Sequence, residues 1–344
     1  MDGNHHPQGE PIAWIADPLV DVDTVDVSAK NISTNGVGDD LGNDDFANKD
    51  VASEEIGDKD LAGGIVGSRR SELEHGRWAH PDLLSLPLSD RGLQLADGLF
   101  ETLLVEQGQP LLLKQHLERW QRSAALLGMG PPPGAEALTP RIGEAVRRSG
   151  IHQGALRLNW SRGSGGRGLD LPAAGAAQPI HRFWLQLSAC QPAFSTLTTI
   201  ISRHERRNAH SLVSHCKTFA YGGQIQARRE ARAAGADEAL LLSSEGELCC
   251  GSTANLLVRR SGRWLTPPAS SGCLPGVMRR QALETALAAE ASLSPDDLFS
   301  SEGALLINSL GCRPLSSCEG QELPSLEPST AESLWRSLLD RAEL

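Results

Sequence analysis

The stretch that decides the fold is residues 97–113, which read DGLFETLLVEQGQPLLL. Residues 99–107 predict a β-strand, and the turn at 107–110 ends it. Residues 110–113 resume as a second strand, so the two form a hairpin. Residues 114–128 then place apolar side chains at helical spacing. A strand pair followed by an amphipathic helix therefore opens the ordered part of the chain.

The rest of the chain alternates between strand patterns and helix patterns. The expected strands are 11–15, 155–161, 181–188, 195–203, 238–242, 247–249, 254–260 and 263–265, and the expected helices are 141–149, 221–234, 276–289 and one starting near 330. This alternation predicts a mixed α/β fold. The expected organisation is an N-terminal strand region to residue 20, an insert over 21–76, a smaller α/β domain over 77–188, a linker over 189–194 and a larger domain over 195–344.

Length and charge limit the classes of function. A chain of 344 residues suits about two domains. The formal charge of -11 is concentrated in residues 21–62, which hold twelve acidic residues against three lysines. The remainder is close to neutral, which disfavours a nucleic-acid partner. The acidic stretch is too polar to offset the entropy of ordering, so we expect residues 21–76 to be a disordered insert or an acidic interaction tail.

Cysteine usage and apolar runs bear on the compartment. The seven cysteines form no CxxC pair and leave one over if they are paired, which is typical of a reducing compartment. No apolar run of about 18 residues exists, and the N-terminus lacks the order of a signal peptide. We therefore expect a cytoplasmic protein with no membrane span, and we assign no metal site.

Lys217 is the first candidate for chemistry. It lies in SHCKTFAY, residues 214–221, between an expected strand and an expected helix, where rigid elements can aim a side chain into a cleft. A lysine amine becomes nucleophilic when burial or a nearby cation lowers its pKa. Taken alone, Lys217 could equally be one of the many solvated surface lysines.

Three further segments could bind anions. Residues 247–256, ELCCGSTANL, and 271–279, SGCLPGVMR, offer backbone N–H groups at a turn and at a helix start. Residues 161–168, SRGSGGRG, hold Arg162 and Arg167, which could grip a substrate carboxylate bidentately. The alternatives are a hairpin turn, a plain helix cap and a solvated linker, respectively.

The order of these motifs resembles one known family. The pieces are DRG at 90–92, DGLFET at 97–102, HLER at 116–119, KT at 217–218, GADEA at 235–239, GST at 251–253, NL at 255–256, LPG at 274–276 and NSL at 308–310. This series resembles the fold-type IV, or class IV aminotransferase, family of pyridoxal-phosphate enzymes over about two thirds of the chain. The resemblance implies two α/β domains with pyridoxal 5'-phosphate at their interface, a small-molecule substrate and a homodimer.

The resemblance also implies roles for individual residues. Lys217 would be the Schiff-base lysine and would move the proton. Arg119 would hold the cofactor phosphate, helped by Ser252, Thr253, Gly276, Val277 and Asn308 or Ser309. Tyr221, the only tyrosine of the chain, would lie near the cofactor hydroxyl, or it could simply pack on the core.

Within the family, the string at 161–168 and Thr102 are similar to the aminodeoxychorismate lyases. This similarity implies release of pyruvate and formation of 4-aminobenzoate for folate synthesis, with Thr102 positioning the substrate. The alternatives are a branched-chain or D-amino acid aminotransferase on the same scaffold and a non-catalytic protein of the same fold.

Cys250 departs from the family pattern. Members usually carry there a glutamate that pairs with the pyridine nitrogen of the cofactor. A thiol cannot hold that proton as a carboxylate does, so the ring should be a weaker electron sink. This favours an elimination driven by aromatisation over transamination, unless Glu247 takes the position through a shift in register.

Overall fold

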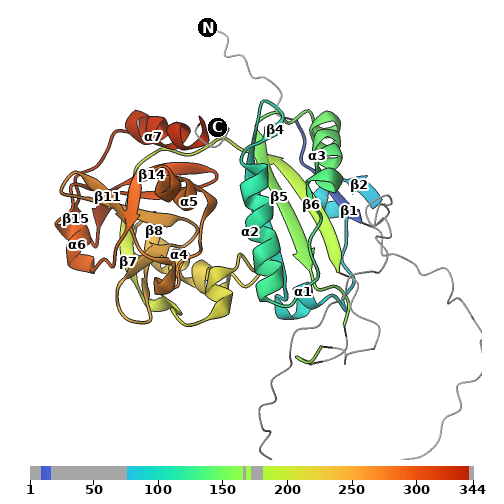
Figure 1. The fold of residues 1–344 in the computed structure, drawn as a ribbon, viewed down its shortest axis with the longest axis horizontal. Coiled ribbons are helices and arrows are strands. Elements are labelled where there is room, and N and C mark those ends of the chain that lie inside the picture. Colours follow the sequence, from blue (N-terminus) through green and yellow to red (C-terminus); the bar gives the residue numbers. More distant parts are fainter. Residues whose placement is uncertain (1–8, 17–75, 166–167, 172–180, 341–344) are drawn as a thin grey trace, which may run out of the picture. The chain divides into compact units, whose positions relative to one another are not determined.

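The computed structural model describes residues 9–16, 76–165, 168–171 and 181–340. These residues form two β-sheets with helices packed against them (Figure 1), which confirms the expected mixed α/β class. The insert expected over 21–76 lies outside the described residues except for Gly76, and so does Arg167. None of the helices in the described ranges is long and apolar enough to cross a bilayer.

The first sheet is antiparallel throughout. Its spatial order is β2 (Gly76–Ala79), β1 (Ile12–Ala16), β6 (Arg182–Ala189), β5 (Gly154–Ser161), β3 (Gly98–Glu106) and β4 (Gln109–Pro110). The hairpin expected over 99–113 is the β3–β4 pair, although its second strand is only two residues long. The helices of this part are η1 (Pro81–Leu83), α1 (Arg91–Leu95), α2 (Leu113–Leu126) and α3 (Ala135–Ser149).

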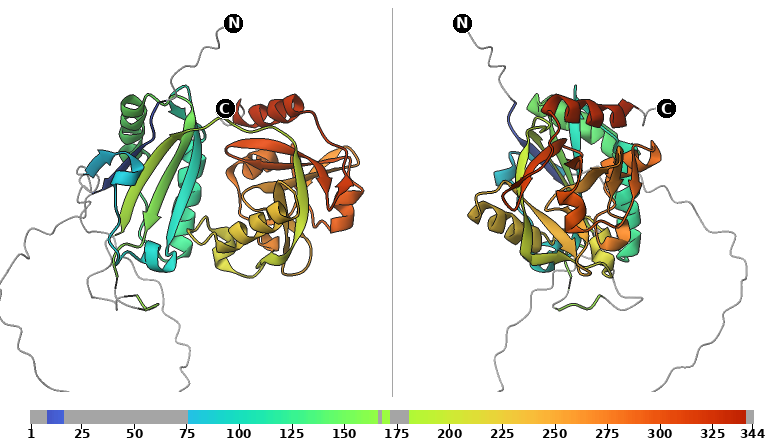
Figure 2. Two further views of the ribbon diagram at one scale, coloured as in Figure 1. Left: turned by 180° about the vertical axis from the view of Figure 1, so that it is seen from behind. Right: turned by 90° about the vertical axis from the view of Figure 1, so that its left-hand side faces the viewer.

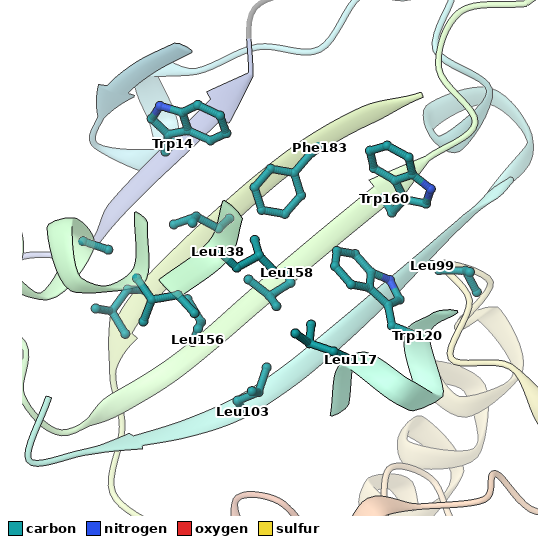
Figure 3. Packing of buried hydrophobic residues seen from close by; sticks show 14 of the residues in the cluster. Trp14, Leu99, Leu103, Leu117, Trp120, Leu138, Leu156, Leu158, Trp160 and Phe183 are labelled. Carbon is teal, nitrogen blue, oxygen red and sulfur yellow. The ribbon is translucent and has the colours of Figure 1, made fainter. Parts of the chain in front are cut away.

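Strand alternation separates the two faces of this sheet. On β3, Leu99 and Leu103 join a buried cluster with Leu117 and Trp120 of α2 and Leu138 of α3 (Figure 3). Phe100, Thr102 and Leu104 point to the other face, because successive side chains of a strand alternate. The two helices therefore cover one face of the sheet and leave the other for different contacts.

The second sheet closes on itself. Its strands run in the order β12 (Ala288–Glu290), β11 (Arg263–Thr266), β10 (Asn255–Arg260), β13 (Gly303–Asn308), β14 (Gly311–Cys318), β7 (Leu197–Arg207), β8 (Glu238–Ser243) and β9 (Leu248–Gly251), with β15 (Gln321–Glu322) beside β14. A pairing of Asn255 with Cys250 joins β10 to β9. A leucine-rich cluster with members on all six strands of the ring fills the interior.

Helices surround the closed sheet in Figure 2. They are η2 (Leu212–His215), α4 (Gly222–Ala233), η3 (Ala269–Ser271), α5 (Val277–Glu284), α6 (Pro295–Phe299) and α7 (Pro328–Asp340). Helix α4 packs against β7 and β8. The buried residue Leu104 of the first sheet belongs to the same cluster as Trp335 of α7, so the uncovered face of the first sheet also has apolar contacts.

Several sequence expectations need correction. The helix expected over 276–289 ends at Glu284, because Ala286 adopts a positive φ of 55° and residues 288–290 form β12. The helix expected from residue 141 begins at Ala135 and contains Pro140, whose missing N–H falls on an exposed side. The central strands β13 and β14 were not expected at all.

Candidate active site

A cavity lies at one end of the closed sheet. It contains about 680 Å³ of empty space, including its solvent-open mouth. The lining comes mainly from residues 211–224, from residues 250–255 between β9 and β10, and from Leu274 before α5. The lining combines hydroxyl, thiol and amide side chains with apolar ones, so the cavity can offer both polar and apolar contacts to a ligand.

Lys217 is held beside this cavity by backbone pairing. Its carbonyl accepts a hydrogen bond of 2.9 Å from the N–H of Phe100, and the N–H of Phe219 donates to the carbonyl of Gly98 at 3.0 Å. An isolated bridge between Leu99 and Thr218 completes the pairing. The segment after η2 thus pairs with the first residues of β3. This pairing fixes the direction in which the lysine side chain leaves the backbone.

The lysine amine lies among aromatic rings. Its Nζ donates a hydrogen bond of 3.0 Å to Oη of Tyr221 and lies 4.3 Å from the ring centre of Phe100. Tyr221 lines the cavity, and its ring meets that of Phe100 edge-on at 5.3 Å. The structure thus brings Lys217 and Tyr221 together. Phe100 was not among the expected site residues, although it lies in the DGLFET motif at 97–102.

Hydroxyls and a helix start meet at another part of the lining. Ser252 and Thr253 line the cavity, and the Oγ of Ser252 accepts from Arg228 at 2.9 Å, which leaves its own proton free to donate. Asn308 donates to the carbonyl of Thr253 at 3.3 Å. Helix α5 begins after Gly276, and the N–H groups of a first helical turn lack partners within the helix.

Gly276 is required at the start of α5. A Cβ atom on it would lie 2.0 Å from Oδ1 of Asn255. The amide of Asn255 donates to the carbonyl of Leu274 at 2.8 Å, which ties β10 to the turn before the helix. Val277 then supplies the first helical N–H. This close packing places the positive end of α5 next to the turn that carries Ser252 and Thr253.

Arg119 belongs to a buried polar cluster. Its Nε donates to Oε1 of Glu101 at 2.9 Å, and another N–H bonds to the carbonyl of Pro275 at 3.4 Å. Nδ1 of His116 lies 2.7 Å from Oε2 of Glu101, and its Nε2 lies 3.1 Å from Oγ of Ser309. The expected phosphate residues Arg119 and Ser309 are therefore connected through two residues that the sequence analysis had not assigned.

Glu101 and His116 have strongly altered acidities. Burial alone would raise the pKa of Glu101, but the charge of Arg119 and the hydrogen bonds from His116 and Arg119 lower it to about 2. Burial lowers the pKa of His116, and its attraction to Glu101 offsets only part of this effect. The cluster therefore holds an ionised carboxylate between a guanidinium and a neutral imidazole.

The face of β3 away from α2 carries another set of polar groups. Thr102 pairs with Arg157 on β5, and the guanidinium of Arg157 lies 3.6 Å from the ring centre of Phe100. Its Nε donates to Oδ1 of Asn159 at 2.7 Å, and no other acceptor within the described residues takes its remaining N–H groups. Burial lowers the pKa of Arg157, although the nearby Tyr221 acts against this.

The sequence analysis had chosen a different arginine for substrate binding. Arg162 is only 7% exposed, and its Nε donates to Oδ2 of Asp97 at 2.8 Å. Its other N–H groups donate to the carbonyls of Gly128 and Leu127, both at 2.9 Å. Each of its three nitrogen atoms thus has a partner within the protein, and the structure gives no support to the substrate role expected for Arg162. Arg167 lies outside the described residues.

Cys250 lines the cavity, whereas Glu247 does not. The carboxylate of Glu247 accepts hydrogen bonds from Ser271, at 3.4 Å, and from Ser292. The alternative in which Glu247 takes the position of Cys250 therefore has no support. Among the described residues that line the cavity, none is an aspartate or a glutamate.

The donor set fits pyridoxal 5'-phosphate. This cofactor requires an amine for its aldehyde, donors for its phosphate and a partner for its ring hydroxyl. Lys217 supplies the amine, Tyr221 the hydroxyl partner, and Ser252, Thr253 and the start of α5 supply donors for an anion. Aromatic rings beside the amine can pack against a flat heterocycle.

Comparison with known proteins agrees with this fit. The chain is 26% identical over 214 residues, 62% of this chain and 73% of its relative, to a putative branched-chain-amino-acid aminotransferase of Methanocaldococcus jannaschii. It is 27% identical over 265 residues, 72% and 91% respectively, to a bifunctional aminodeoxychorismate lyase / D-amino acid transaminase of Mycobacterium tuberculosis. The fold matches that of the PLP-bound form of a hypothetical aminotransferase from M. tuberculosis, with a TM-score of 0.66 at 24% identity, over 78% of this chain and 96% of the other.

Fold and cavity together define a pyridoxal-phosphate-dependent enzyme. Residues 98–318 match the family described as amino-transferase class IV, and the chain belongs to that family. The matched region begins with β3 and ends with β14, so it includes every residue that lines the cavity.

Proposed function

We propose that the chain is a 4-amino-4-deoxychorismate lyase, which releases pyruvate and forms 4-aminobenzoate for folate synthesis. The observation that carries the proposal is the thiol of Cys250 in a cavity whose described lining holds no carboxylate. When bound, the cofactor withdraws electrons from the carbon that bears the substrate nitrogen. A ring without a carboxylate partner does this less strongly, and aromatisation of the product compensates for that weakness.

Lys217 and Tyr221 act directly in this reaction. Nζ of Lys217 accepts the proton from C4 of the substrate, and Oη of Tyr221 holds that amine in place. The bond between C3 and the enolpyruvyl oxygen then breaks, its electrons leave with the enolpyruvate, and a proton completes pyruvate. No oxidant or reductant is needed, because the ring gains its aromaticity from this elimination.

We assign substrate binding to the face of the first sheet that points away from α2. Arg157 has N–H groups to offer a carboxylate, and Thr102 lies opposite it in register. A guanidinium binds a carboxylate through parallel hydrogen bonds. Arg157 therefore takes the role that the sequence analysis gave to Arg162, while Arg167 remains a candidate from outside the described residues.

The direct test is to incubate the cofactor-loaded protein with freshly generated aminodeoxychorismate and to follow 4-aminobenzoate and pyruvate. We expect both products in equal amounts from the wild type and neither from Lys217→Ala. Lys114→Ala, the same change at an exposed lysine of α2 that does not line the cavity, is a control that should leave turnover intact. Absence of both products from a loaded wild-type protein would contradict the proposal.

The second candidate is an aminotransferase acting on branched-chain or D-amino acids. The names of the relatives from M. jannaschii and M. tuberculosis favour it. Addition of single amino acids to the loaded protein distinguishes the two functions. Conversion of the cofactor to its amine form, with release of a keto acid, would favour the aminotransferase.

We also propose a cytoplasmic homodimer. All seven cysteines are free thiols, six of them buried, which suits a reducing compartment. Leu88 and Leu169 are 82% and 81% exposed, and Arg91 ties their segments together through the carbonyl of Leu169 at 3.2 Å. Exposed leucines on neighbouring segments suit a subunit contact. Light scattering of the purified protein should give twice the chain mass, and Leu169→Asp should lower it.

A further inference from the structure

Glu101, His116 and Ser309 form a buried chain of hydrogen bonds, and the chemistry of the three groups determines which of them donates in each bond. Glu101 and His116 are each only 1% exposed, and the two contacts of the imidazole are 2.7 Å and 3.1 Å long. An ionised carboxylate can only accept hydrogen bonds. Nδ1 of His116 must therefore carry the proton that faces Glu101, and Nε2 is left to interact with Ser309.

In the neutral imidazole, Nε2 is an acceptor. The hydroxyl of Ser309 must then donate its only proton to His116. In this state, the oxygen of Ser309 can accept hydrogen bonds but cannot donate one to an anion. A protonated imidazole reverses the arrangement, because Nε2–H then donates to Ser309 and the hydroxyl proton is free to turn elsewhere.

Ser309 lies next to the anion-binding side of the cavity. Its neighbour Asn308 donates to the carbonyl of Thr253, which lines the cavity, and Arg119 reaches the carbonyl of Pro275 before α5. A bound phosphate would need donors at this position. While His116 is neutral, the Ser309 proton is directed toward the histidine instead.

We propose that His116 is a positioning residue that couples phosphate binding to proton uptake. When the cofactor phosphate enters, His116 takes one proton from solvent, donates from Nε2 to Ser309, and thereby turns the Ser309 hydroxyl toward the phosphate. The inference does not depend on which substrate the enzyme turns over. It depends on the assignment of the turn at Ser309 to the phosphate.

The charges around His116 make its protonation state sensitive to an added anion. Glu101 on β3 favours the protonated form, whereas Arg119 on the same helix and Lys217 before α4 oppose it, and Ser309 is uncharged. Burial lowers the pKa of His116 below its ordinary value. A phosphate dianion bound near Ser309 would add negative charge, which raises that pKa again.

The test measures protons and needs no turnover. Pyridoxamine 5'-phosphate carries the phosphate but no aldehyde, so it binds without a reaction at Lys217. Calorimetric titration near pH 7 in two buffers of different ionisation enthalpy gives the number of protons taken up. We expect the wild type to take up as much as one proton more than His116→Gln, and Ser309→Ala to lose most of this difference. His204→Gln, an exposed histidine, is the matched control and should behave as the wild type.

A pH series and an NMR titration complete the test. Proton uptake makes affinity fall as pH rises, by up to about tenfold per pH unit for one proton, and this excess slope should be absent in His116→Gln. The ring signals of His116 in the wild type should change from neutral to protonated when the ligand is added. Equal proton numbers in the wild type and His116→Gln, or an imidazole that stays neutral with ligand bound, would overturn the proposal. Failure of the lyase assay would leave these results unaffected.

Discussion

The two faces of strand β3 make opposite use of polar residues. Glu101 points toward α2, where Arg119 and His116 satisfy its carboxylate. Thr102, one residue later, points to the open face beside Arg157, whose guanidinium has donors to spare. A buried polar group with all its partners stabilises and orients the fold, whereas a polar group with free donors is available to a ligand.

The largest expected effect concerns Glu101, on the face of β3 that points toward α2. Glu101→Ala leaves Arg119 buried beside no carboxylate, and removing one partner of a buried ion pair costs about 3–5 kcal/mol. Thr102→Ala on the other face should cost less than about 1 kcal/mol. Urea denaturation of both variants measures the difference in the free energy of unfolding. Similar losses for the two variants would mean that the faces do not differ as described.

The next largest effect is that of acid on the contribution of Glu101 to the free energy of unfolding. The pKa of Glu101 is lowered from 4.5 to about 2, so its contribution is complete above pH 4.5 and is lost as pH falls toward 2. A shift of this size corresponds to about 3 kcal/mol. The free energy of unfolding of the wild type should therefore decrease more steeply over this range than that of Glu101→Gln. Parallel curves would show that the carboxylate is not responsible.

The smallest expected effect sharpens the comparison between two arginines. Arg157→Met should raise KM for the substrate about 10- to 100-fold, because it removes a charged hydrogen bond worth about 1.5–3 kcal/mol. Arg162→Met should instead lower stability and leave KM nearly unchanged, since its donors bind Asp97 and two carbonyls. Steady-state kinetics and thermal melts of both variants test this. An unchanged KM in Arg157→Met would return the substrate role to Arg167.

The periodicity of the sequence predicted most of the strands and helices. Strands such as β5 and β6 and helices such as α2 and α4 carry their own apolar pattern, and the structure has them within a few residues of the expected positions. The ends of α3 and α5 were missed. The helix expected over 141–149 begins six residues earlier and contains Pro140, and nothing local signals the positive φ of Ala286. Closure of the second sheet depends on β13 and β14, which were not expected.

The candidate site was predictable only where short motifs carry it. Lys217 and Tyr221 lie in one motif, and the structure joins them by a hydrogen bond. Arg162 was misjudged because a glycine-rich string reads as an exposed loop, and its partner Asp97 lies 65 residues earlier. Arg157 could have been noticed as a charge alternating with Leu156 and Leu158, but only the register of β3 and β5 shows that it meets Thr102.

The closure of the second sheet has a mechanical consequence. The single pairing of Asn255 with Cys250 is the seam of the ring, and the residues between them line the cavity. Besides this pairing, β9 and β10 are held by the turn at 252–254 and by a hydrogen bond of 2.9 Å from the N–H of Gly251 to the carbonyl of Ala254. A molecule bound to this turn contacts both strands, so binding in the cavity should stabilise the closed sheet. The enzyme would then lose its most slowly exchanging amide protons when it loses its cofactor.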